Sequence, residues 1–146
     1  MKLAFVEIQN FRKLKACRIE VASQETILVG ANNSGKTSAM DSMILLLKKN
    51  CRKNIATTDF TLSNWSHINQ IGTQWADAGE DDKPDLTLEQ WFPYLLSIDI
   101  WLDVNEADIH YVIHILPTLD WAPDQLLGIR LILAPKDTKE LYKEFR

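Results

Sequence analysis

Residues 26–40 run Thr26-Ile27-Leu28-Val29-Gly30-Ala31-Asn32-Asn33-Ser34-Gly35-Lys36-Thr37-Ser38-Ala39-Met40. A β-branched apolar run leads into the pattern G-x-x-x-x-G-K-[ST], and an apolar helical run follows. This order of strand, glycine-rich loop and helix is typical of a phosphate-binding loop. The two loop glycines allow backbone conformations that a side chain would block. Backbone N–H groups are then expected to face an anion at the positive end of the helix.

Two side chains at the end of this loop have expected roles. Lys36 is expected to reach the β- and γ-phosphates of a nucleotide, and the Thr37 hydroxyl to hold Mg²⁺. The alternative is a Gly/Ser-rich turn that contains an incidental lysine. The strand before the loop and the helix after it favour phosphate binding, because a chance match would usually lack that context.

The composition indicates one ordinary globular domain. Of 146 residues, 46% are hydrophobic and 25% are charged, which is a soluble profile. No apolar run approaches the roughly 20 residues needed to span a bilayer, and no signal-peptide pattern is present. Cys17 and Cys51 are isolated and lack metal-type spacing. We therefore expect a reducing, cytoplasmic setting and no membrane partner.

The formal net charge of −4 conceals an asymmetry along the chain. Residues 1–55 contain ten Lys/Arg and four Asp/Glu, whereas residues 56–146 contain six and sixteen. A basic first third suits a polyphosphate partner and nucleic acid. The alternative is a solvated charged face, and it applies equally to the basic residues outside the loop, which are Arg12, Lys13, Lys15 and Arg18.

Periodicity predicts the secondary structure of the first third. Alternating apolar residues indicate strands over 3–9 and 16–21, joined by a turn at 10–13. A third strand is expected over 26–29, and a helix over 36–49. That helix is apolar most of the way round, so we expect it to be buried against a central sheet. Its expected apolar face contains Ala39, Met40, Met43, Ile44 and Leu47, widened by Leu45 and Leu46.

Residues 51–95 have the least regular pattern and are expected to form an irregular or helical insertion. Asn64 is positioned to cap a short helix. A polar, turn-rich loop is expected over 79–84. Thr87 with Gln90 resembles a capping box.

The last third returns to regular elements. Strict alternation predicts a strand over 96–104, with Asp99 on a solvated outer face. A helix capped by Asn105 follows, then a strand over 127–134, and finally a helix that starts near Asp137.

Two histidines have a spacing that zinc sites use. His110 and His114 lie four apart on a predicted helix and so share one face. A zinc protease would have glutamate where this chain has Tyr111, and no third ligand is evident. We therefore expect ordinary helix-surface histidines.

The first fifty residues resemble a known group of ATPases. Two stretches carry this resemblance: Ile8-Gln9-Asn10-Phe11-Arg12-Lys13 and, after a second strand, Ile27-Leu28-Val29-Gly30-Ala31-Asn32-Asn33-Ser34-Gly35-Lys36-Thr37-Ser38. They are similar to the amino-terminal lobe of ABC-type ATPases of the RecF, SMC and OLD (overcoming lysogenization defect) groups. Asn32-Asn33-Ser34 is most similar to the OLD-type ATPases. Thr58-Asp59-Phe60 adds a less specific similarity.

The resemblance implies binding of ATP and Mg²⁺, head-to-head dimers or higher oligomers, and action on DNA. OLD proteins couple this lobe to a Toprim nuclease, and several relatives defend bacteria against phage. By matched position, Arg12 is expected to approach the nucleotide, and Thr37 to bind the metal. The other expected nucleotide-binding residues are Gly30, Asn32, Asn33, Ser34, Gly35, Lys36, Thr37 and Ser38.

The sequence also departs from this family pattern. We find no LSGG-type signature, no Walker B acidic pair, no switch histidine and no Toprim acidic cluster. Phosphoryl transfer needs a positioned water and a metal-holding carboxylate in addition to the loop. We therefore assign no catalytic residue. Residues 1–146 are expected to form the amino-terminal lobe of an ATPase domain whose remaining lobe and nuclease lie elsewhere, and this chain alone is not expected to hydrolyse ATP.

The predicted fold class is α/β. We expect an incomplete P-loop NTPase domain with a mixed sheet, the phosphate-loop helix and an added antiparallel strand pair. The predicted function is the ATP-binding part of an OLD-like, ATP-dependent nuclease acting on DNA in antiviral defence or repair. The alternatives are an ATP-driven switch subunit without nuclease activity, a small kinase, and a structural domain whose loop binds nothing.

Overall fold

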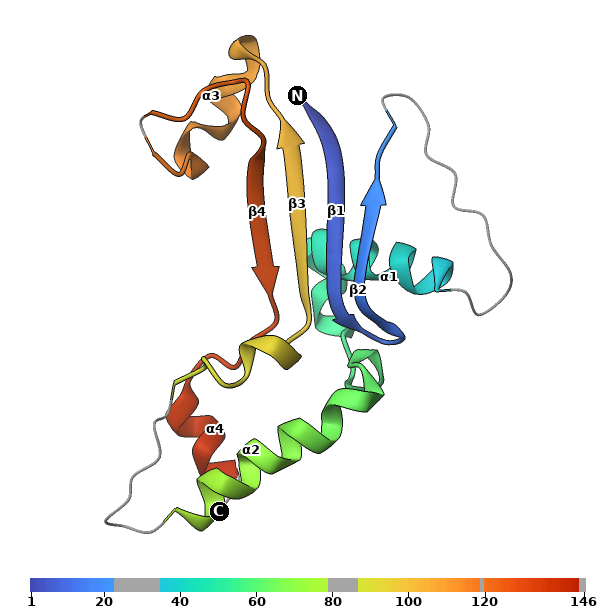
Figure 1. The fold of residues 1–146 in the computed structure, drawn as a ribbon, viewed down its shortest axis with the longest axis vertical. Helices are drawn as coiled ribbons and strands as arrows, with labels where there is room; N and C mark the ends of the chain where they lie inside the picture. Colours follow the sequence, from blue (N-terminus) through green and yellow to red (C-terminus); the bar gives the residue numbers. More distant parts are fainter. Residues whose placement is uncertain (23–34, 79–86, 119, 145–146) are drawn as a thin grey trace.

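A computed structural model describes residues 1–22, 35–78, 87–118 and 120–144. In these ranges a four-stranded sheet has the order β2-β1-β3-β4, and helix α1 crosses one of its faces (Figure 1). The strands are β1 (Lys2–Phe11), β2 (Leu14–Glu20), β3 (Ser97–Asp103) and β4 (Leu127–Ile132). The helices are α1 (Lys36–Leu47), α2 (Trp65–Asp77), α3 (Ile109–Val112) and α4 (Thr138–Glu144).

The three pairings among the described strands are all antiparallel. The predicted front hairpin and the added strand pair are therefore confirmed. The predicted mixed sheet is not found in the part of the chain that the structure describes. A parallel partner would have to be the predicted strand 26–29, which lies outside the described residues, as do the predicted loop 79–84 and loop residues 30–34.

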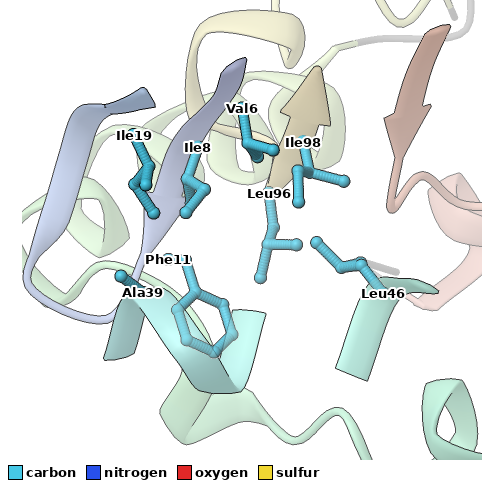
Figure 2. Packing of buried hydrophobic residues seen from close by; sticks show 8 residues of the cluster. All are labelled: Val6, Ile8, Phe11, Ile19, Ala39, Leu46, Leu96 and Ile98. Carbon is cyan, nitrogen blue, oxygen red and sulfur yellow. The ribbon is translucent and has the colours of Figure 1, made fainter. Parts of the chain in front are cut away.

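Strand alternation separates the sheet into two faces. On the face toward α1, Val6 pairs with Ile19 and Ile100, and Ile8 pairs with Cys17 and Ile98. Cys17 and Ile100 are partly buried and pack against one buried cluster that the strands form with the helix (Figure 2), whose members are Val6, Ile8, Phe11, Ile19, Ala39, Leu46, Leu96 and Ile98. A period of two thus places a continuous apolar surface under α1.

The buried side of helix α1 overlaps the predicted apolar face only in part: Ala39 and Leu46 are buried, and Met43 and Leu45 pack against the core. The buried residues are Ala39, Ser42 and Leu46, whereas Met40 and Ile44 are 46% and 41% exposed. Small side chains let the helix approach the sheet closely. The Ser42 hydroxyl donates to the Ala39 carbonyl at 2.7 Å, so it is buried without losing its hydrogen bond. The helix also ends at Leu47, two residues earlier than predicted.

The opposite face of the sheet contains an ion pair between a buried carboxylate and an exposed arginine. Asp99 is only 9% exposed, so the prediction that it is solvated is wrong. Arg130, its partner across β3 and β4, donates from Nε and Nη2 to the two carboxylate oxygens, each at 2.7 Å. These hydrogen bonds raise the pKa of Arg130 above its ordinary value. A bidentate pair of this kind satisfies the carboxylate that the sheet removes from water.

On the same face, Phe5 stacks on Trp101 with ring centroids 5.5 Å apart. The Trp101 ring lies over Gly128, where an added Cβ would come within 3.0 Å of it.

Helices α2 and α4 lie together beyond one end of the sheet, and α3 lies at the other end (Figure 1). A second apolar cluster, built on Ile71, Trp75, Trp91 and Leu95, joins α2 to α4 through Leu141 and Tyr142. The final helix is confirmed. Asn105 is also confirmed as a cap, because its side chain accepts from the Asp108 backbone N–H at 3.0 Å.

Two predicted caps differ from the structure. The helix predicted after Thr87 does not form: residues 88–91 form a turn, and Phe92–Tyr94 is a short 3₁₀ segment containing Pro93. Asn64 does precede α2, but it makes no capping hydrogen bond. Its amide instead donates to the Asn10 side-chain oxygen at 2.8 Å.

Asn10 connects the end of β1 to two distant segments. It has a left-handed φ of 59°, which asparagine tolerates better than most residues. Its amide donates to the carbonyls of Pro93 and Leu95, both at 2.9 Å. With the bond from Asn64, three buried or partly buried hydrogen bonds depend on this side chain.

We expect Asn10→Ala to lower the free energy of unfolding by roughly 2–4 kcal/mol, because it leaves buried polar groups unpaired and strains φ. Urea unfolding measures the change. Gln9→Ala is the matched control, since Gln9 is exposed on the same strand. Equal stability of the two variants would contradict this assignment.

Candidate nucleotide-binding site

The last glycine of the phosphate-loop motif occupies a position that requires glycine. Gly35 immediately precedes α1 with φ of 94° and ψ of −1°, a left-handed conformation that side chains disfavour. An added Cβ would also lie 3.0 Å from Leu14 Cδ2. Leu14 is the first residue of β2, so the front hairpin lies close to the start of α1.

The first turn of α1 suits an anionic ligand. Lys36 and Ser38 are half-buried and Thr37 is exposed. Among the described residues no side chain caps this helix, and its first turn contains no acidic residue. No carboxylate of that turn therefore competes with a phosphate for the positive end of the helix.

These residues fit a magnesium nucleotide by their chemistry. Lys36 offers a positive charge to the phosphates, and Thr37 offers the hydroxyl that holds Mg²⁺ in P-loop proteins. The remaining predicted loop residues, Gly30, Asn32, Asn33 and Ser34, lie outside the described residues. Their contacts with a nucleotide stay a prediction, as do those of Gly35, Lys36, Thr37 and Ser38.

Arg12 lies in the turn between β1 and β2 and faces two carboxylates. Its Nε donates to Asp59 Oδ1 at 2.9 Å, and its Nη1 donates to Asp41 Oδ2 at 2.6 Å. Its backbone N–H also donates to the Asp59 carbonyl at 2.7 Å. The structure thus brings Arg12 to α1 through Asp41, and its approach to a nucleotide stays a prediction.

The charge state of this cluster follows from its contacts. Burial of Arg12 acts to lower its pKa, but hydrogen bonds and charge attraction from Asp41 and Asp59 outweigh burial and raise the pKa above its ordinary value. Asp59 is only 5% exposed, and its second oxygen accepts from the Ala56 backbone N–H at 2.9 Å. The guanidinium therefore stays charged and paired.

Three residues of this region had no assigned role in the sequence reading. The sequence around Leu14 does not indicate a role for it, because apolar residues are common at strand starts. Asp41 does stand out in the sequence, because it is the single charged residue between Ser38 and Leu47. Asp59 lies in Thr58-Asp59-Phe60, a stretch that indicates only a family resemblance. A lone charge in an apolar helix usually has a partner, and that rule would have found Asp41.

The other candidate chemistry is not supported. The described residues contain no group of three His, Cys, Asp or Glu that could hold a metal ion, and the side chains of His110 and His114 are exposed. None of the described helices is long and apolar enough to cross a membrane.

We expect Gly35→Ala to weaken ATP binding and to destabilise the fold by about 1–2 kcal/mol, because it strains φ and forces Leu14 to move. Adding Leu14→Ala should relieve the contact but not the backbone strain, and so restore only part of the loss. Calorimetry and thermal melting measure both effects. Full recovery in the double variant would show that φ at this position is unimportant.

Comparison of this sequence with known protein families agrees with the phosphate-loop geometry at the start of α1. Residues 1–145 match the family model described as AAA ATPase domain. The chain is also similar to the DNA replication and repair protein RecF of Vibrio campbellii and of Vibrio cholerae serotype O1, with 44% identity over 46 residues in each case. The identity to RecF of Vibrio atlanticus is 41% over the same length.

The RecF match is local. It covers 32% of this chain and 13% of each RecF protein, so the chain spans only a small part of these relatives. No solved structure matches the chain. The family model, in contrast, covers nearly every residue. The start of α1, Gly35-Lys36-Thr37, corresponds to the P-loop of such ATPases, and the ATP-binding role of the chain follows from the domain. This chain belongs to the AAA ATPase domain family.

Proposed function

We propose that this chain is the ATP-binding part of an OLD-like, ATP-dependent nuclease that acts on DNA in antiviral defence or DNA repair. The observation that carries the proposal is the start of α1. There a left-handed Gly35 leads into Lys36 and Thr37, on a helix without a side-chain cap or a first-turn carboxylate among the described residues.

The chemistry of binding follows from this helix start. Its dipole and the Lys36 ammonium stabilise the phosphate charge, and the Thr37 hydroxyl orients the metal. Mg²⁺, when bound, neutralises charge on the phosphate oxygens. Hydrolysis also requires a positioned water and further metal-holding carboxylates. We propose that other parts of the protein supply these groups, so this chain binds ATP without turning it over.

Action on DNA has two supports. The relatives named above are DNA replication and repair proteins, and residues 1–55 carry ten basic against four acidic side chains. The nuclease rests on the resemblance of Asn32-Asn33-Ser34 to OLD-type proteins. Pairing of two ATPase heads around ATP, or a higher oligomer, and a cytoplasmic location belong to the same proposal.

We expect this chain to bind ATP with Mg²⁺ at micromolar concentration and Lys36→Ala to abolish the binding, because the phosphates lose their charge partner. Isothermal calorimetry measures both. Lys48→Ala is the matched control, since Lys48 is exposed at the opposite end of the same helix. Thr37→Ala should retain ATP but lose the dependence on Mg²⁺. Unchanged binding in Lys36→Ala would refute the nucleotide assignment.

The nuclease is tested on the full-length product of the gene. We expect plasmid cleavage that requires Mg²⁺ and ATP and that Lys36→Ala removes. Intact plasmid alongside normal ATP binding would refute the nuclease, and would favour an ATP-driven switch subunit.

A further inference from the structure

We propose that Arg12 is a positioning residue: with Asp41 and Asp59 it clamps the β1–β2 turn to α1 and so sets where the phosphate-binding end of that helix lies. This assignment replaces direct contact of Arg12 with the nucleotide. Its effect on ATP affinity rests on the proposed function, whereas its effect on the helix does not.

The first support is that one side chain links three segments. The guanidinium reaches Asp41 on α1 at 2.6 Å and Asp59 at 2.9 Å. Asp59 belongs to the 3₁₀ segment Thr57–Asp59 and is fixed in turn by the Ala56 N–H. A planar fork with donors in fixed directions suits such a double contact better than an ammonium does.

The second support is that the residues next to Arg12 in the β1–β2 turn are held in place by the core. Phe11, the residue before Arg12, is fully buried in the core cluster, and the Arg12 guanidinium lies 4.8 Å from its ring centroid. Arg12 itself has a left-handed φ of 51°. Because the buried ring and the Asn10 hydrogen bonds fix the turn, the direction of the Arg12 side chain is fixed as well.

The third support is the position of the contact along α1. Asp41 follows Gly35 by six residues, so it lies about 9 Å along the helix axis from the phosphate-binding end. Leu14, two residues after Arg12 and the first residue of β2, lies next to Gly35, where an added Cβ would be 3.0 Å from its Cδ2. The front hairpin therefore lies beside α1 at its start and is bonded to it through Arg12 in its second turn.

The fourth support is electrostatic. Two carboxylates against one guanidinium leave the cluster with one net negative charge, which would repel a phosphate. The two carboxylates already offset the guanidinium charge that would attract a phosphate, and one of them, Asp59, is buried.

The decisive variant is Asp41→Asn, because the two roles of Arg12 predict opposite signs. If Arg12 positions α1, replacing the carboxylate by a neutral amide weakens this contact and loosens the helix start, and the Kd for ATP should rise by up to about tenfold, because a charge-assisted hydrogen bond becomes an ordinary one. If Arg12 binds phosphate, the same variant frees it and removes a nearby negative charge, and the Kd should fall. Calorimetry at 0.15 M salt screens the general charge effect at this separation.

Arg12→Lys gives an independent comparison. An ammonium keeps the charge that a phosphate ligand needs but cannot donate to both carboxylates in the guanidinium geometry. A positioning role predicts that Arg12→Lys weakens ATP binding as much as Arg12→Ala does. Nearly complete retention of binding by Arg12→Lys would overturn the proposal. Lys13→Ala is the control, since Lys13 is exposed in the same turn, and should bind ATP normally.

A readout without nucleotide separates this proposal from the proposed function. Amide hydrogen exchange should become faster in α1 in Asp41→Asn and Arg12→Lys, and stay unchanged in β3 and β4. If the wild-type chain fails to bind ATP, the proposed function fails while this measurement still tests the clamp. Unchanged exchange in α1, or tighter ATP binding by Asp41→Asn, would overturn it.

Discussion

The burial of Phe11 at the end of β1 is the constraint on which the rest of the structure depends. Its ring is fully buried between the sheet and α1 (Figure 2). Asn10 and Arg12 on either side adopt left-handed backbone conformations. Because both flanking side chains then point to fixed partners, one turn orders α1, the entry to α2 and the segment before β3.

The buried carboxylates of this domain form ion pairs with arginines from other segments of the chain. Arg12 holds Asp59 and Asp41, and Arg130 holds Asp99. Asp59 and Asp99 are buried, and a carboxylate removed from water without a partner would be costly, so each arginine offsets the cost of burying one of them. The first turn of α1 differs: neither a carboxylate nor a side-chain cap is found there among the described residues, which is the condition for binding an external anion.

Sequence patterns predicted the features that depend on neighbouring residues. Alternation located β1 to β4, and the glycine spacing located the start of α1 at Lys36. The misassigned residues depend on distant partners: Asp99 is buried because Arg130 lies opposite, and Asn64 bonds to Asn10, 54 residues away. For α1, an apolar circumference could not indicate which side meets the sheet. Only the assembled fold shows that Ser42 is buried there, while Met40 and Ile44 are exposed.

The central claim is that ATP binds at the first turn of α1. Its most direct test is amide hydrogen exchange on this chain with and without ATP and Mg²⁺. The account predicts slower exchange at the start of α1 and in the β1–β2 turn that contacts it, with no change in β4 on the far edge of the sheet. Unchanged exchange at the start of α1 under saturating nucleotide, or protection confined to β3 and β4, would contradict the claim.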